Sequence, residues 1–132
     1  MRYMLDTDIC IYVINKRPQH VFDRFKEHRV GDIGLSSVAL SELRYGAEKS
    51  PNPEKNLSAL SAFITPLEII AYSEAEAEVY GKIRAELESQ GEPIGSMDLL
   101  IAAHALSLGS ILVTNNIREF SKVSNLKIES WV

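Results

Sequence analysis

Short apolar runs alternate with longer segments of helical periodicity along almost the whole chain. The apolar runs cover residues 3–5, 33–35, 67–71, 110–114 and 127–129. Strands separated by helices favour a parallel sheet, because each helical crossover carries the chain back to the same end of the sheet. The pattern therefore predicts an α/β fold, with three α/β/α layers around a mainly parallel central sheet.

Prolines and capping residues mark the expected helix boundaries. Pro18 and Pro53 suit first helical turns, Ser73 with Glu76 forms a capping box, and Gly109 suits a helix end. The expected helices cover residues 9–14, a segment from 18 onward, and residues 38–49, 53–63, 73–91 and 98–109. No repeat or linker is visible, so we expect a single domain over residues 1–132.

Composition narrows the class of protein. The chain is 45% hydrophobic and 24% charged, which is ordinary for a globular domain with a core. Its one cysteine, Cys10, has no internal disulfide partner and is expected to be a small buried hydrophobe. Neither a signal peptide nor an apolar run of about 18 residues is visible, so we expect a cytoplasmic protein without a membrane partner.

The formal net charge of −4 opposes binding to nucleic acid. A phosphate-rich substrate would therefore need local basic patches and bound cations.

Three acids stand where a parallel α/β sheet builds its sites. Asp6 follows the first strand directly, and ligands of such sheets bind beyond the carboxyl ends of the strands. Glu42 lies on a helical face with Val38 and Tyr45, between an apolar stripe and a solvent-facing stripe. A carboxylate in this position either belongs to a site or forms an ion pair with Lys49 or with a neighbouring helix.

Asp98 opens a helix that is apolar on every side and is expected to be buried. The free N–H groups of the first helical turn favour its ionised form. Asp98 is therefore either a metal ligand or an ordinary capping acid. The segment 114–120, after the strongest strand, adds two amides and an acid, although a plain Asn-rich turn also explains it.

Oxygen donors at one sheet edge would bind Mg²⁺, with Mn²⁺ as a substitute. Zinc spacing is missing, because the chain has one cysteine and three scattered histidines. His104 lies about 240° around its helix from Asp98, so their side chains point apart and His104 is expected to be structural and hydrogen-bonded.

In this order and spacing, the motifs resemble the PIN-domain ribonucleases, and within them the VapC-type toxins of bacterial toxin–antitoxin pairs. The resemblance covers nearly the whole chain. It is carried by residues 4–9, 37–47, 91–95, 98–105 and 114–120.

The resemblance implies a PIN-like fold and Mg²⁺-dependent hydrolysis of RNA, with tRNA among the substrates of relatives. It assigns catalytic roles to Asp6, Glu42, Asp98 and Asn116, with Asp6 and Asp98 as metal ligands. Asn116 stands where the family often has Asp, which favours a water-positioning role. Asp8 stands where Asn or another small polar residue is common, so it is either a helix cap or a perturbation of the metal site.

The resemblance also implies a homodimer and a VapB-type antitoxin through which the pair reaches promoter DNA. Four cations are candidate contacts to the RNA backbone: Arg17, Arg44, Lys49 and Arg118.

Two other functions stay open. A catalytically inactive PIN-fold binding module is one, because Asn116 is neutral. A phosphatase of the haloacid dehalogenase class is the other, because residues 5–8 resemble its opening Asp-x-Asp, although Cys10 departs from its pattern and no acidic pair follows the last strand.

Overall fold

The computed structural model describes the backbone of residues 1–132 and every side chain except that of Val30. Its five strands form one sheet in the order β3-β2-β1-β4-β5, and every neighbouring pair is parallel. The strands are β1 (Tyr3–Leu5), β2 (Ile33–Ser36), β3 (Glu68–Ile70), β4 (Ile111–Val113) and β5 (Ile128–Glu129). The predicted α/β fold is confirmed, and the sheet is wholly parallel.

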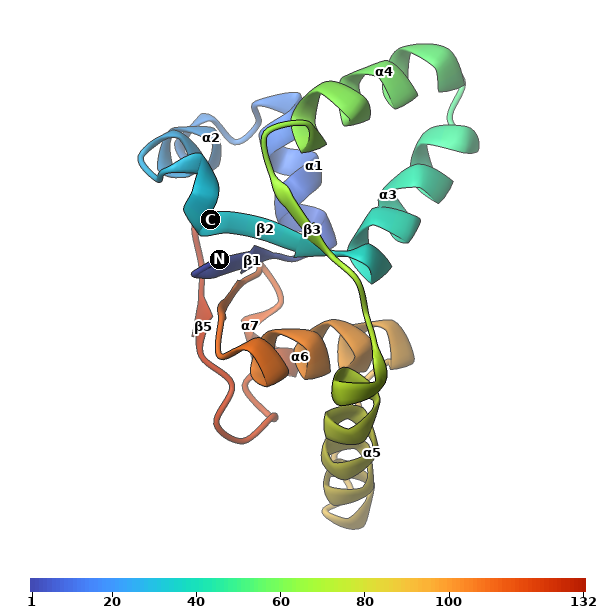
Figure 1. Ribbon diagram of the computed structural model, residues 1–132, viewed down its shortest axis with the longest axis vertical. Helices are drawn as coiled ribbons and strands as arrows, with labels where there is room; N and C mark the ends of the chain where they lie inside the picture. The colour runs from blue at the N-terminus through green and yellow to red at the C-terminus, as the bar shows by residue number, and fades with distance from the viewer.

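Helices cover both faces of the sheet, with α1 to α4 on one face and α5 to α7 on the other (Figure 1). They are α1 (Thr7–Asn15), α2 (Gln19–Lys26), α3 (Ser37–Glu48), α4 (Pro53–Ile64), α5 (Glu74–Ser89), α6 (Ser96–Leu108) and α7 (Ile117–Phe120), with a 3-10 turn η1 (Val30–Asp32). The three-layer arrangement is therefore confirmed. The helix α7 was not expected, because four residues are too few to show a helical period.

The core lies between the sheet and the helices. The strand β1 is buried along its length, and Met4 and Leu5 are 0% exposed. Cys10 is also 0% exposed, which confirms it as a buried hydrophobe, and burial raises the pKa of its thiol above the ordinary range. Among the helices that the structure describes, none is both long and apolar enough to cross a membrane.

Strand order decides which residues meet at the carboxyl edge of the sheet. The central strand β1 pairs with β2 on one side and with β4 on the other, and Leu5 is in register with Val113. Asp6 and Thr114 therefore leave adjacent strands at the same edge. The segment that leads from β2 into α3 reaches this edge too.

Candidate active site

Asp6 is fixed by two hydrogen bonds at the carboxyl end of β1. Its Oδ1 accepts from the backbone N–H of Thr7 at 2.8 Å, so Asp6 caps α1. Its Oδ2 accepts from the Thr114 hydroxyl, also at 2.8 Å. Because the side chain is only 5% exposed, both carboxylate oxygens are held in one orientation.

The environment of Asp6 disfavours its negative charge. Burial raises its pKa from 3.8 to about 6, and the hydrogen bonds from Thr114 and Thr7 oppose this only in part. The negative charges of Asp98 and Asp8 raise the pKa of Asp6 further. A bound cation would reverse the balance, because positive charge favours the ionised carboxylate.

Glu42 lies in α3, and a residue of α1 links it to Asp6. The Thr7 hydroxyl donates to Glu42 Oε1 at 2.9 Å, while the backbone N–H of the same residue donates to Asp6. Among the described side chains, Glu42 forms no ion pair; Lys49 instead lies over the ring of Tyr45, 4.9 Å from its centre. The structure thus brings Glu42 to the sheet edge and does not form the alternative ion pair with Lys49.

Asp98 is half-buried in the first turn of α6. The residue that caps α6 is Gly95, and no side chain forms a capping hydrogen bond there, so Asp98 is not a capping acid. The expectation that the helix start favours its ionised form is wrong for the metal-free protein, because its pKa is raised chiefly by burial and further by the negative charges of Glu42, Glu119 and Asp8. These charges act on Asp98 across elements that are distant in sequence.

The loop after β4 holds the fourth predicted residue, Asn116, at the start of α7. Its backbone N–H donates to the Thr114 hydroxyl at 2.9 Å, so Thr114 joins Asn116 to Asp6. The side chain of Asn116 is half-buried and does not cap α7. Its amide is thereby left for another role, as a water-positioning residue requires.

Sequence reasoning left Glu119 outside the proposed set of site residues. Glu119 lies in α7, is paired with Lys122 at 3.2 Å, and raises the pKa of Asp98 by its charge. A signal was available, since Glu119 stands three residues after Asn116, on the same face of any helix that begins there. The sequence placed this acid after the strongest strand, but without an expected helix α7 nothing directed its side chain towards Asp98.

We call Asp6, Asp98 and the carboxylates whose charges raise their pKa values the acidic cluster: Asp6, Asp8, Glu42, Asp98 and Glu119. As the described side chains stand, no three acidic, histidine or cysteine groups are close enough to hold one metal ion. The donor chemistry nevertheless fits Mg²⁺ or Mn²⁺, because these hard ions prefer carboxylate oxygen and the cluster has no sulfur or imidazole. A divalent cation would replace repulsion by attraction and draw the carboxylates inward.

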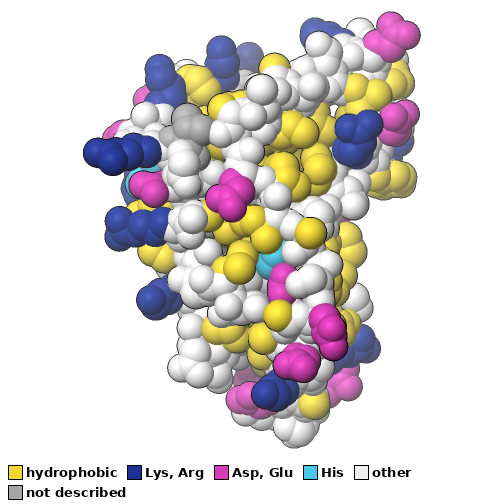
Figure 2. Space-filling view, viewed as in Figure 1, with side chains coloured by type: hydrophobic (Ala, Val, Ile, Leu, Met, Phe, Trp, Pro, Cys, Tyr) yellow, Lys and Arg dark blue, Asp and Glu magenta, His cyan; other side chains and the backbone are white. Residues whose placement is uncertain are grey.

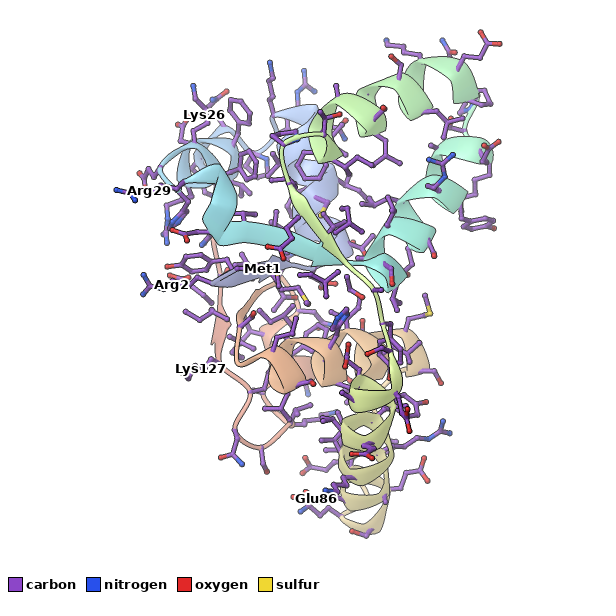
Figure 3. All side chains as sticks on the ribbon, in the orientation of Figure 1. Met1, Arg2, Lys26, Arg29, Glu86 and Lys127 are labelled. Atoms are coloured by element: carbon purple, nitrogen blue, oxygen red, sulfur yellow. The ribbon has the colours of Figure 1, made fainter. Side chains whose placement is uncertain are left out.

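The cations predicted to contact RNA are all exposed: Arg17, Arg44, Lys49 and Arg118. Arg118 precedes Glu119 in α7, close to the acidic cluster. By contrast, Arg2, Arg29 and Lys127 lie at the edge where the strands begin, away from the cluster (Figure 3). Positive charge near the cluster therefore comes from few side chains.

An apolar hollow of about 240 Å³ lies beside Glu42, between α1, α3 and α4. Figure 2 shows hydrophobic side chains gathered in this hollow. Glu42 forms part of its lining, and Ile11 on its wall is 41% exposed. The apolar lining includes Ile11, Ile14, Leu43, Ala47, Ala59 and Leu60. An apolar surface that reaches a charged site is suited to a protein segment.

Comparison with known sequences identifies relatives along the whole chain. The model of the PIN domain family matches residues 3–126. The tRNA(fMet)-specific endonuclease VapC of Shigella flexneri is 47% identical, across 99% of this chain and 98% of that protein. Ribonuclease VapC2 of Haemophilus influenzae is 48% identical, across 100% of this chain and 99% of that protein.

Solved structures give the same result. The DNA-bound VapBC of Salmonella typhimurium superposes with a TM-score of 0.94 at 44% identity, covering 100% of this chain and 99% of that one. VapBC2 of Rickettsia felis, bound to a DNA fragment from its promoter, gives 0.91 at 44% identity and covers both chains completely.

Proposed function

Since this chain belongs to the PIN-domain family, as a VapC-type ribonuclease toxin of a VapBC toxin–antitoxin system, we propose that its acidic cluster hydrolyses RNA phosphodiester bonds with the help of Mg²⁺. Mn²⁺ would substitute. The observation that carries the proposal is the proximity of three carboxylates at the carboxyl edge of the sheet. The negative charge of Asp98 raises the pKa of Asp6, and the negative charge of Glu42 raises the pKa of Asp98. Asp98 of α6 thus interacts both with Asp6, which caps α1, and with Glu42 of α3.

Each residue has a role that its contacts suit. Asp6 and Asp98 hold the cation, and Thr114 fixes the orientation of Asp6. Glu42, oriented by Thr7, completes the ligand set directly or through water. Asn116 positions the attacking water with its free amide, and Glu119 adds negative charge beside Asp98. When bound, the cation supplies an activated water and neutralises charge on the phosphate.

We also propose tRNA as the substrate. Relatives from Shigella flexneri and Salmonella typhimurium are named tRNA(fMet)-specific endonucleases. Exposed cations near the cluster, Arg118 above all, would contact the RNA backbone. The enzyme would act in the cytoplasm, where tRNA is found.

The proposed partners are a second copy of the chain and a VapB-type antitoxin. The apolar hollow beside Glu42 is where an antitoxin segment would both bind and block the acidic cluster. Solved VapBC complexes with DNA support the further proposal that promoter DNA is reached only through the antitoxin.

The proposed function is tested with purified protein and tRNA. Cleavage is expected with Mg²⁺, and a chelator is expected to stop it. Expression of the chain alone should arrest growth of its host, and Asp6→Ala should relieve the arrest. Cleavage that persists in the chelator would reject the role of the metal, and equal arrest by both proteins would reject the role of Asp6.

The same assay separates the alternatives. An inactive PIN-fold binding module would bind tRNA without cutting it under any metal condition. The haloacid-dehalogenase alternative has lost its support, because the PIN-domain model matches residues 3–126. A phosphoenzyme trapped on Asp6 would be needed to restore it.

A further inference from the structure

A buried imidazole joins the helices that carry the acidic cluster. His104 lies in α6 and is 0% exposed. Its Nδ1 is 2.7 Å from the Ser36 hydroxyl, and its Nε2 is 3.3 Å from Glu76 Oε1. Ser36 caps α3, which carries Glu42, and Glu76 lies in the first turn of α5. The expectation that His104 is hydrogen-bonded is thus confirmed, and its partners connect three helices.

The contacts of Ser36 indicate which group donates in its hydrogen bond with His104. The Ser36 oxygen accepts from the backbone N–H of Val38 at 3.0 Å, so its own hydroxyl proton is free to be donated to His104 Nδ1. The proton of the neutral ring is then on Nε2, which lies 3.3 Å from Glu76 Oε1 without the geometry of a hydrogen bond. Burial lowers the pKa of His104 despite the opposing charge of Glu76, so the ring is neutral at neutral pH. Tyr72 packs edge-on against the ring, 5.6 Å between ring centres.

Packing alone does not explain a histidine at this position. The neighbouring side chains of α6 are apolar and buried, and several of them are alanines: Leu99, Ile101, Ala102, Ala103 and Ala105. Alanine side chains bury a helix in the core but interdigitate little with neighbouring side chains. They therefore do little to stop the helix from shifting along its neighbours. Among the described side chains of α6, only His104 makes a hydrogen bond to another element. Apolar residues often replace such buried polar groups without loss of stability, so stability alone does not account for the imidazole.

On the premise of the proposed function, we infer that His104 is a positioning residue that sets the distance between the Asp98 and Glu42 carboxylates. Asp98 and His104 are six residues apart in α6, and Ser36 and Glu42 are six residues apart along the cap and body of α3. The bond between His104 and Ser36 therefore links the two helices at one point, and a rotation of α6 about that point would move Asp98. His104 acts through these two helices and touches neither the substrate nor the cation.

Two substitutions separate positioning from packing. His104→Leu replaces the imidazole by an apolar side chain of similar size and loses the acceptor for the Ser36 hydroxyl. His104→Asn keeps an acceptor near the place of Nδ1 but fills less of the space. We expect His104→Leu to weaken Mn²⁺ binding about tenfold, the usual cost of losing a residue that orients metal ligands. His104→Asn should unfold at lower temperature yet bind Mn²⁺ more nearly like the wild type.

The measurement is calorimetric titration of the metal-free full chain with Mn²⁺, together with thermal unfolding. Asn52→Ala is the matched control, because Asn52 caps α4 as Ser36 caps α3 but makes no bond to α6.

Three results would overturn the inference. His104→Leu could bind Mn²⁺ as tightly as the wild type, His104→Leu and His104→Asn could weaken binding equally, or Asn52→Ala could weaken it as much as His104→Leu. A wild-type protein that binds no Mn²⁺ would instead overturn the proposed function, and the inference with it.

Discussion

Asp6→Asn is expected to lower the rate of RNA cleavage about a hundredfold or more while making the metal-free protein more stable at neutral pH. Asparagine removes the negative charge that attracts the cation and replaces one oxygen by an N–H donor. It keeps the capping role at α1, because asparagine accepts from Thr7 as well as aspartate does, while its amide N–H can donate to Thr114 once that hydroxyl turns to accept. The loss of activity would therefore not come from unfolding.

The gain in stability follows from the raised pKa of Asp6. The carboxyl has a pKa of about 6 in the folded protein and 3.8 as its ordinary value. Protonated Asp6 therefore contributes fully to the free energy of unfolding below pH 4. This contribution declines as the pH rises to 6 and is lost above that. The free energy of unfolding differs by about 3 kcal/mol between the two limits. Asp6→Asn should recover up to this amount at pH 7 and much less at pH 4.

Urea unfolding of metal-free protein at the two pH values, with cleavage assays of the same samples, checks both parts. Asp23→Asn is the control, because Asp23 is an exposed acid of α2 that lies outside the acidic cluster. A variant that cleaves RNA normally, or that is less stable than the wild type at pH 7, would contradict the account of Asp6.

Mn²⁺ binding is expected to weaken at least about tenfold for each pH unit below 6, because the cation must displace the proton from Asp6. The pKa of Asp98 is raised too, so a second proton would make the dependence steeper. Above pH 7 Asp6 is ionised, so its share of the pH dependence should level off. Calorimetry in two buffers of different ionisation enthalpy measures the affinity and the protons released.

Asp98→Asn provides the comparison for this titration. It leaves Asp6 as the main group that must lose a proton, so the residual binding should be weaker but less steep in pH. A flat pH profile of the wild type between pH 5 and 7 would show that the cation is not held by these buried carboxylates.

The fold was predictable because local sequence patterns indicate most of its helices and strands. The strand at residues 3–5 and the capping box of Ser73 and Glu76 were both predicted and are both present. Strand ends were less predictable: residues 67–71 were expected as a strand, but β3 extends only from Glu68 to Ile70. Where a strand ends depends on its partner, and no local pattern specifies the partner.

The sequence could nominate candidate site residues but not the connections between them. Asp6 follows a strand, and this alone marked it as a candidate. Its bond to Thr114 spans 108 positions in the chain and exists only because β1 and β4 are neighbours in the sheet. The contact of His104 with Ser36 depends in the same way on how α6 packs. Such contacts follow from strand order, which periodicity does not give.

The most direct test of the acidic cluster is to crystallise the protein with Mn²⁺ and locate the ion by its anomalous scattering. One strong peak is expected at the carboxyl edge of the sheet, with Asp6 and Asp98 as direct ligands and Glu42 bound directly or through water. Mn²⁺ bound away from all three acids, or no peak in crystals of protein that cleaves RNA, would contradict the central claim.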